Sequence, residues 1–476
     1  MDNLPDGLIA IVKHDCPTCV LVEPVLQRLA REAAPLTIYC QDDPAFPSQV
    51  PVVDDMDLEV SYKLGTEIVP TLIQARDGRE QRRVLGWNRA EWQGLTGLPD
   101  LGADLPENRP GCGSKSLDPG VAEALARRFG APGLVSRRVV LAPLEDEIEA
   151  AYERGWSDGL PLVPPTEDRV LKMLAGTSRS PQEVIGAIPP DLAECTVEKV
   201  AVNAVMAGCK PEYLPVVLAA VEAALIDEFG MHGLLCTTMF AGPVVIVNGP
   251  VATRIGMNSG GNALGQGTRA NATIGRALQL VIRNVGGGKP GEIDRACLGT
   301  PGKYTFCFAE DEAGSDWESL SVERGFPPGA STVTLFAGEG VQGIVDQHSR
   351  TAESLARTYA QCLFAVDHPK LCLAGDALLV VSPEHARVFR SAGWSKARLK
   401  EELHELLLRP GADLVPGAGG IAEGIPAEFK DRRVPKFRDG GLNIVRAGGQ
   451  AGLFSAIIAG WAASGEVGSS PVTKAI

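Results

Sequence analysis

The feature that most constrains the fold is an apolar strand that runs into two closely spaced cysteines and then into a helix. Residues 7–13 form a continuous apolar run with the length of a buried strand. Cys16 and Cys19 follow in the order Cys-Pro-Thr-Cys, and an amphipathic helix is predicted from there to about Glu32. At the start of a helix, free N–H groups and the helix dipole stabilise a thiolate. This context predicts a redox dithiol whose first cysteine attacks a sulfur–sulfur bond and whose second resolves the mixed disulfide.

The alternative for this cysteine pair is half of a zinc site. Such a site would require a second Cys-x-x-Cys or paired histidines nearby, and His14 and Cys40 are the only candidates close in sequence. Two further Asp/His pairs, at 346/348 and 367/368, match no firm metal-binding pattern and are interpreted as structural. No metal and no cofactor other than the dithiol is therefore expected.

The elements predicted after the first helix continue the same pattern. They are a strand over 36–40, a helix over 58–64, strands over 70–74 and 82–85, and a helix over 88–95. Val69-Pro70-Thr71 stands at the start of the paired strands. With these motifs, residues 7–96 resemble a compact member of the thioredoxin/glutaredoxin superfamily, and the Cys-Pro-x-Cys order is similar to the glutaredoxin version. The resemblance implies that Cys16 is the nucleophile, Cys19 the resolving thiol, and Pro70 a cis proline beside which an extended substrate pairs with the backbone.

Chain length and composition predict the domain organisation. A chain of 476 residues is expected to form two or three domains. The N-terminal domain is assigned to residues 1–97, and the Gly-, Pro- and Asp-rich stretch 98–120, with Cys112 between two glycines, is predicted to be a linker. Residues 121–476 alternate strands and helices, which predicts a larger mixed α/β domain with a catalytic role. The fold class is therefore α/β, with a thioredoxin-like domain followed by this larger one.

Several segments of the larger domain resemble an uncharacterised bacterial family in which this domain occurs alone or fused to a thioredoxin-like arm. The resemblance carries no settled activity. The segments are 158–165, 197–213, 258–262, 269–276 and 301–310.

A glycine-rich loop and a helix with evenly spaced arginines suggest a ligand site in this domain. The loop precedes a helix predicted over 274–285, and Arg269, Arg276 and Arg283 recur every seven residues, which places them on one helix face. A second glycine-rich turn, 447–452, lies between a strand and a predicted apolar helix ending near Trp461. One hypothesis is a pocket for a carboxylate or phosphate; the other is a solvated arginine face beside turns that need glycine. The candidate substrate-binding residues are Asn258, Ser259, Gly260, Asn262, Arg269, Asn271, Arg276, Lys303, Glu310, Gly448 and Gly449.

Lys303, Cys307 and Glu310 form a second candidate group. On one strand, Lys303 and Cys307 would face the same side, where the lysine could activate a thiolate, and Glu310 could act as an acid or base. The alternative is an edge strand with a charged exit loop. Cys307 and the linker cysteine Cys112 are the predicted redox partners of the Cys16–Cys19 pair.

Composition excludes several function classes. The formal charge of −14 and the absence of a polybasic run argue against nucleic-acid and anionic-membrane partners. No signal peptide and no apolar stretch long enough to span a bilayer is recognised, and eleven dispersed cysteines do not suggest a disulfide framework, so a cytoplasmic location is expected.

The expected function is a thiol–disulfide oxidoreductase arm joined to a catalytic domain. That domain would reduce or cleave a small anionic substrate in a thiol-dependent reaction, with a cellular thiol reductant restoring the arm. The alternatives are a redox-independent lyase or hydrolase with a thioredoxin-like sensor or repair arm, and a scaffold whose arm recruits client proteins. The sequence leaves the oligomeric state, including a homo-oligomer, open.

Overall fold

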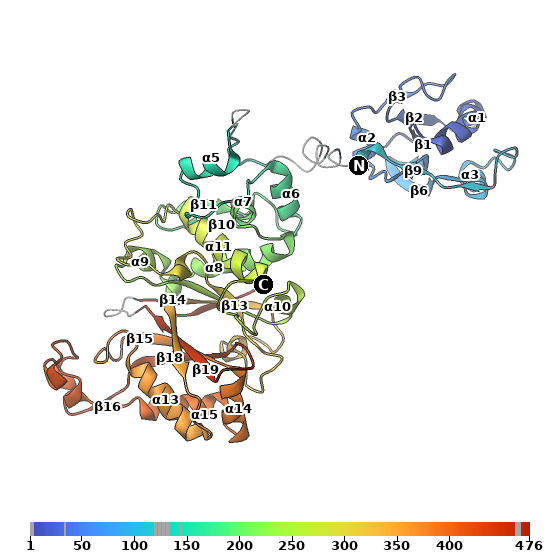
Figure 1. The fold of residues 1–476 in the computed structure, drawn as a ribbon. Helices are drawn as coiled ribbons and strands as arrows, with labels where there is room; N and C mark the ends of the chain where they lie inside the picture. Colours follow the sequence, from blue (N-terminus) through green and yellow to red (C-terminus); the bar gives the residue numbers. More distant parts are fainter. Residues whose placement is uncertain are drawn as a thin grey trace. The chain divides into compact units, whose positions relative to one another are not determined.

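The computed structural model describes residues 4–32, 35–118, 134–139, 145–461 and 468–476, with positions 121, 125, 129 and 141. The chain divides into two compact units, Met1–Val135 and Ser136–Ile476 (Figure 1). Both combine helices with sheets, so the mixed α/β class is confirmed. The start predicted for the larger domain, residue 121, falls where the structure describes isolated positions only. In the described part of the chain, no helix is both long and apolar enough to cross a membrane.

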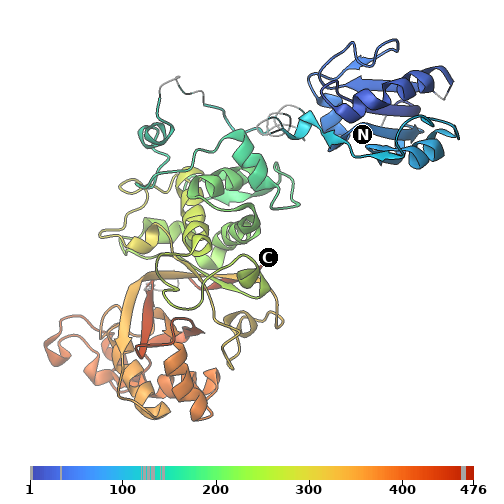
Figure 2. The same cartoon turned by 45° about the vertical axis from the view of Figure 1, so that its right-hand side comes forward.

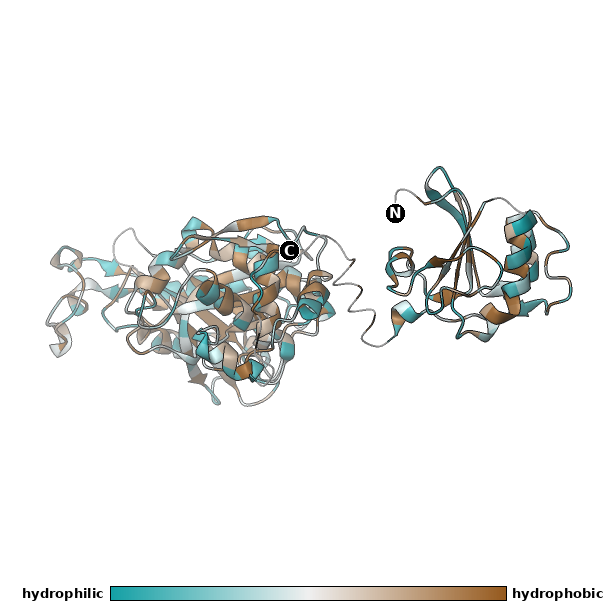
Figure 3. Ribbon diagram, turned by 90° about the horizontal axis from the view of Figure 1, so that it is seen from above, coloured by the Kyte–Doolittle hydropathy of each residue, from teal (hydrophilic) through white to brown (hydrophobic). Residues whose placement is uncertain are grey.

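The first unit is built on a five-stranded sheet in the order β3-β2-β1-β5-β6. β1 pairs in parallel with β2 and antiparallel with β5. Residues 9–12 of β1 are fully buried, because the strand lies in the middle of the sheet, and Figure 3 shows these strands as strongly hydrophobic. The elements are β1 (Gly7–Val12), α1 (Pro17–Glu32), β2 (Leu36–Cys40), β3 (Val53–Asp54), α2 (Glu59–Lys63), β5 (Thr71–Arg76), β6 (Arg79–Leu85) and α3 (Arg89–Thr96).

The stretch predicted as a linker is instead part of the first unit. β8 (Asn108–Arg109) pairs with β7 (Trp87–Asn88), and β9 (Cys112–Gly113) pairs with β4 (Ile68–Val69). We call residues 108–114 the docked segment. Gly111 permits close packing: a Cβ there would lie 2.3 Å from Ile68 Cγ2 and 2.5 Å from the Val69 carbonyl oxygen. A composition typical of linkers was therefore misleading here.

The second unit is built on a seven-stranded mixed sheet. Its order is β13-β12-β14-β19-β15-β18, with β20 also pairing with β14. In Figures 1 and 2, α13, α14 and α15 gather beside β15, β18 and β19, whereas α7, α8 and α11 gather at the other end of the unit. The sheet strands are β12 (Gly242–Asn248), β13 (Cys307–Ala309), β14 (Thr332–Val345), β15 (Gly375–Val381), β18 (Phe437–Arg446), β19 (Phe454–Gly460) and β20 (Val472–Ala475).

The helices α5 to α9 precede the first strand of this sheet in sequence, α10 to α15 lie between its strands, and two small two-stranded sheets complete the unit. The helices are α5 (Glu147–Glu153), α6 (Glu167–Leu174), α7 (Val197–Ala207), α8 (Leu214–Ala224), α9 (Met231–Cys236), α10 (Pro250–Arg254), α11 (Arg269–Asn284), α12 (Leu320–Glu323), α13 (Ala352–Phe364), α14 (Pro383–Ser391) and α15 (Lys396–Leu406). The small sheets pair β10 (Val184–Ile188) with β11 (Ala193–Thr196), and β16 (Arg409–Pro410) with β17 (Arg433–Val434).

The prediction of an apolar helix before Trp461 is wrong. The segment is strand β19, hydrogen-bonded between β14 and β15. Ile457 and Ile458 are both fully buried although they point to opposite faces. A strand covered on both faces shows no polar–apolar alternation, so its apolar run cannot be told from a buried helix by periodicity.

Candidate functional site

The dithiol lies where β1 passes into α1. Cys16 directly precedes the first residue of α1, and Cys19 lies in the first turn of that helix. The Cys19 backbone N–H donates to Cys16 Sγ over 3.4 Å. Both side chains are almost completely buried, with exposed fractions of 1% and 0%. The two thiols therefore meet at the N-terminus of a helix inside the first unit.

The surroundings of Cys16 favour its thiolate. A hydrogen bond with the Cys19 thiol is the largest cause of a pKa lowered to about 5. Burial opposes this effect, while the Cys112 thiol and the N–H groups of Cys19 and Thr18 reinforce it. Burial, followed by the hydrogen bond with Cys16, raises the pKa of Cys19. At neutral pH the pair is thus one thiolate and one neutral thiol, the arrangement that nucleophilic attack requires.

Cys112 is a third member of this site. Its Sγ lies 2.9 Å from the Sγ of Cys16, and burial raises its pKa. In the β4–β9 pairing, Cys112 stands opposite Val69 and Gly113 opposite Ile68. The sequence placed Cys112 in a linker; the structure places it in direct contact with the predicted nucleophile.

The peptide bond between Val69 and Pro70 is cis, the geometry that the resemblance implies for Pro70. The Val69 carbonyl oxygen lies 3.6 Å from Cys16 Sγ, which places this turn against the dithiol. The backbone edge beside the proline, where the resemblance places an extended substrate, is paired with the chain's own residues 112–113.

Hydrogen bonds fix the docked segment on both sides of Cys112. Before it, Thr18 Oγ1 donates to the Pro110 carbonyl over 2.7 Å. After it, Gln41 Nε2 donates to Ser114 Oγ over 2.7 Å, and the Ser114 N–H donates to the Glu67 carbonyl over 2.9 Å. The Gln41 and Ser114 side chains are buried. These hydrogen bonds offset the free-energy cost of removing the two polar side chains from water. The segment is therefore held by specific polar partners.

In the second unit, the two glycine-rich turns meet. The Gly448 N–H donates to the Ser259 carbonyl over 2.9 Å, and a Cβ on Gly449 would lie 3.4 Å from Gly261 Cα. The asparagines of the first turn stabilise the turn itself. Asn271 Oδ1 accepts from the Asn258 N–H, Asn258 Oδ1 accepts from the Gly260 N–H, and Asn262 Nδ2 donates to the Gln266 carbonyl.

The arginines of α11 bind groups of the second unit itself. Arg276 makes a two-pronged ion pair with Asp158, with bonds of 2.8 and 2.7 Å, and both side chains are nearly buried. Arg269 Nε donates to the Gly208 carbonyl over 2.9 Å. The sequence suggested either a solvated arginine face or a pocket for an anion. Neither hypothesis fits this helix, because Arg269 and Arg276 bind neighbouring segments of the chain.

The expected pairing of Lys303 with Cys307 on one strand face is wrong. β13 begins at Cys307, whereas Lys303 ends a 3-10 turn and pairs with Asp294 over 2.6 Å. Cys307 is buried, and burial raises its pKa far above the usual range. This thiol has the surroundings of a structural cysteine.

Glu310 is also buried, with 3% of its side chain exposed. Its Oε1 lies 3.6 Å from Lys396 Nζ, and its Oε2 accepts from Asn248 Nδ2 over 2.7 Å and from the Leu320 N–H over 2.8 Å. Burial raises the pKa of Glu310, and Lys396 opposes the shift. These contacts join β13, β12 and two later helices, which is a structural role.

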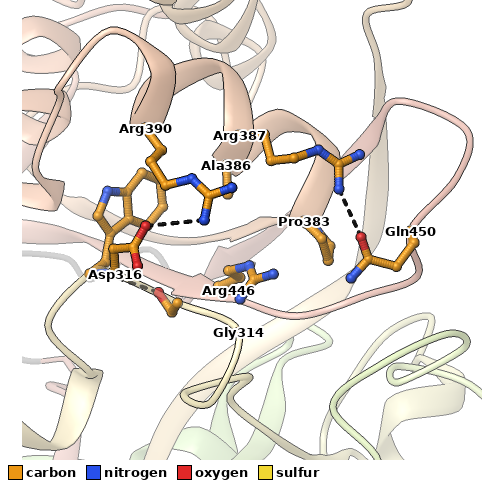
Figure 4. Close-up of a pocket in the computed structure, with 10 residues that line it drawn as sticks. Gly314, Asp316, Pro383, Ala386, Arg387, Arg390, Arg446 and Gln450 are labelled. Atoms are coloured by element: carbon orange, nitrogen blue, oxygen red, sulfur yellow. Dashed lines mark hydrogen bonds and ion pairs between the residues drawn. The ribbon is translucent and has the colours of Figure 1, made fainter.

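A cavity of about 260 Å³ lies between α14, the end of β18 and the loop after β13 (Figure 4). Figure 4 shows Arg390 turned towards Asp316 and Arg387 turned towards Gln450, with Arg446 below them. Arg390 pairs with Asp316 over 3.2 Å, and Arg387 donates to Gln450 over 2.9 Å. The lining residues are Gly314, Ser315, Asp316, Trp317, Pro383, Ala386, Arg387, Arg390, Arg446 and Gln450.

Arg446 is the most buried charge in this cavity, with 8% of its side chain exposed. Its Nη1 lies 3.1 Å from an Asp311 oxygen, and its Nε has no hydrogen-bond partner among the described residues. The sequence missed this group because Arg387 and Arg390 lie on α14, whereas Arg446 ends β18, far away in the sequence. The one available signal was the glycine-rich turn, which contributes Gln450 directly after Gly448 and Gly449.

Comparisons with protein-family models, with curated proteins and with solved structures gave no match to this chain.

Proposed function

We propose that the first unit is a thioredoxin-like arm that exchanges thiols and disulfides, with Cys16 as nucleophile and Cys19 as resolving thiol. The observation that carries this proposal is the position of Cys16 at the N-terminus of α1, where its sulfur accepts from the Cys19 N–H over 3.4 Å and lies 2.9 Å from Cys112 Sγ. These surroundings lower the pKa of Cys16 to about 5, whereas the pKa values of Cys19 and Cys112 are raised. A thiolate with neutral thiols in contact can attack a disulfide and then be resolved. A purely structural cysteine cluster would not need one acidic member.

The exchange has two balanced steps. The Cys16 thiolate attacks one sulfur of a substrate disulfide, which forms a mixed disulfide and releases the other sulfur as a thiolate. Cys19 then loses its proton and attacks Cys16 Sγ, which releases the second substrate thiolate and leaves a Cys16–Cys19 disulfide. The substrate gains two electrons and the arm loses two, so an external thiol must restore the arm.

For the second unit, we propose binding of a small anionic substrate in the cavity lined by Arg387, Arg390 and Arg446. Three guanidinium groups line this cavity, and the buried Nε of Arg446 has no hydrogen-bond partner among the described residues, which suits a carboxylate or phosphate. The covalent link to the arm would give the dithiol a high effective concentration at this unit's site. If turnover does not consume reducing equivalents, the second unit is a redox-independent enzyme and the arm a sensor or repair module.

The exchange activity can be tested with a small disulfide, hydroxyethyl disulfide, and with dithiothreitol as reductant. We expect Cys16→Ser to reduce the catalysed rate to the uncatalysed background, because serine forms no disulfide. Cys19→Ser is expected to slow turnover, because the Cys16–Cys19 disulfide can no longer form. Cys297→Ser, at an exposed cysteine of the second unit, is the matched control and should retain full activity. Undiminished activity of Cys16→Ser would contradict the assignment.

The anion cavity can be tested by calorimetric titration with inorganic phosphate and with a small dicarboxylate. We expect Arg390→Met to weaken the binding of whichever anion binds by about tenfold, since one charged hydrogen bond contributes ~1.5–3 kcal/mol. Arg398→Met, at an arginine on α15 that does not line the cavity, should leave the affinity unchanged. Equal effects of the two variants would mean that the cavity does not recognise anions.

A further inference from the structure

The docked segment covers the predicted nucleophile. Cys16 and Cys19 have exposed fractions of 1% and 0%, whereas Cys112 is partly exposed. While the segment is docked, a thiol from solvent can reach Cys112 but not Cys16. A dithiol that exchanges with outside partners therefore needs either the departure of the segment or a route through Cys112.

We propose that Cys112 is a third redox-active cysteine, which forms a disulfide with Cys16 and is the sulfur that exchanges with outside thiols. This inference rests on the proposed exchange activity of Cys16 and adds its route to solvent. Three geometric observations carry it: the 2.9 Å contact of the two sulfurs, the antiparallel pairing of Cys112 with Val69, and the unequal exposure of the three thiols.

The docked segment also occupies the edge of β4. An extended peptide gains affinity by adding main-chain hydrogen bonds to an exposed strand edge. Here residues 112–113 supply those bonds to β4, and Thr18 holds the preceding turn through Pro110. The outside partners expected for this arm are therefore small thiols and disulfides, which need no free strand edge.

The exchange through Cys112 balances in both directions. To oxidise the arm, Cys112 loses its proton to solvent and attacks a small disulfide RSSR, which gives Cys112–SR and RS⁻. The Cys16 thiolate then attacks Cys112 Sγ and releases the second RS⁻, which leaves a Cys16–Cys112 disulfide. To reduce the arm, RS⁻ attacks Cys112 Sγ and expels Cys16, and a second RS⁻ removes the first as RSSR. Cys16 is the favoured leaving group because a thiolate of low pKa leaves fastest.

Cys19 connects the two disulfides of the arm. Its thiolate can attack Cys16 Sγ in the Cys16–Cys112 disulfide, which releases Cys112 and forms Cys16–Cys19 without net oxidation. Cys16 is thus the shared sulfur of both pairs, with Cys19 on its buried side and Cys112 on its exposed side.

Two glycines of the segment provide a matched pair of variants. A Cβ at position 111 would lie 2.3 Å from Ile68 Cγ2 and 2.5 Å from a backbone oxygen, whereas a Cβ at position 113 has no atom within 4 Å. Gly111→Ala should therefore loosen the segment, and Gly113→Ala should not. Thr18→Val, which removes the hydrogen bond to Pro110 and adds no bulk, is a milder second variant.

The test is disulfide mapping by mass spectrometry on the full chain after oxidation with oxidised glutathione. In Cys19→Ser we expect an intramolecular Cys16–Cys112 disulfide. Gly111→Ala in that background should lower its yield and raise the rate at which iodoacetamide alkylates Cys16 by at least ~10-fold. Gly113→Ala should change neither. Circular dichroism confirms that each variant is folded, and Thr18→Val replaces Gly111→Ala if the latter is not.

The ways in which the two proposals can fail are distinguishable. If oxidised Cys19→Ser carries glutathione on Cys16 while Cys112 stays free, the inference is overturned, and the proposed exchange activity of Cys16 stands. The inference is overturned in the same way if Cys112→Ser reacts with oxidised glutathione as fast as the unmodified chain. If Cys16 forms no disulfide in any variant, the proposed exchange function itself fails.

Discussion

Titration of the reduced protein, followed by thiolate absorbance near 240 nm, is expected to show one cysteine that ionises with a midpoint near pH 5. Cys16 is that residue, because the Cys19 thiol, the Cys112 thiol and two backbone N–H groups all stabilise its thiolate. An ordinary cysteine ionises near pH 8.5. The expected step should vanish in Cys16→Ser, and its midpoint should rise in Cys112→Ala, which removes one donor. A titration with no step below about pH 8 would contradict the structure of this site.

The same lowered pKa makes stability depend on redox state and pH. A cysteine whose pKa is lower in the folded state stabilises that state above its unfolded pKa, and this stabilisation is lost as the pH falls through about 5. The reduced first unit should therefore gain stability between pH 5 and about 8.5, whereas the disulfide form lacks this contribution. Hydrogen exchange of β1 amides in both redox states over this range measures the difference. Equal pH dependence of the two states would rule out a role for the Cys16 thiolate.

Lys396→Met is expected to lower the free energy of unfolding of the second unit by ~3–5 kcal/mol, the usual loss when one partner of a buried ion pair is removed. Lys396 and Glu310 have 3% of their side chains exposed, and Lys396 also lies 3.2 Å from Glu323. Without the lysine, Glu310 remains buried without a cation and its pKa should rise further. The loss should therefore be larger at pH 8 than at pH 5, because folding of the variant then requires protonation of Glu310.

Chemical denaturation of the full chain measures this loss, with Lys400→Met as the control. Lys400 lies 3.1 Å from Glu323, but it is about one-third exposed, and such pairs contribute at most ~1 kcal/mol. In Lys396→Met, Glu310→Gln, the second change removes the uncompensated charge and should recover part of the stability. If Lys396→Met and Lys400→Met were equally stable, the buried pair would not be a structural element of the core.

The sequence predicted the helices and main strands of the first unit closely, because each carries a local signal. The apolar run of β1, the helical spacing of α1 and the Asp77-Gly78 turn between β5 and β6 depend on neighbours in sequence. The docked segment has no such signal. Gly111 allows close approach to β4, and this requirement for glycine depends on Ile68, a residue far from it in sequence.

The candidate site was likewise predictable only where its residues are close together in sequence. Cys16 and Cys19 are three residues apart, so their context identified them. Cys112 contacts Cys16, which lies 96 residues away in the sequence, and Arg276 pairs with Asp158, which lies 118 residues away. Contacts of this kind are set by tertiary packing, which is why the arginine face of α11 was interpreted as a ligand site although its charges are already paired.

The docked segment has a mechanical consequence. It lies between the sheet of the first unit and residue 136, where the second unit begins. A disulfide from Cys16 to Cys112 would join the docked segment covalently to the start of α1, and its reduction would leave only hydrogen bonds and packing to hold it. The redox state of a single sulfur pair would thereby set how readily residues 108–114 leave the surface of the first unit.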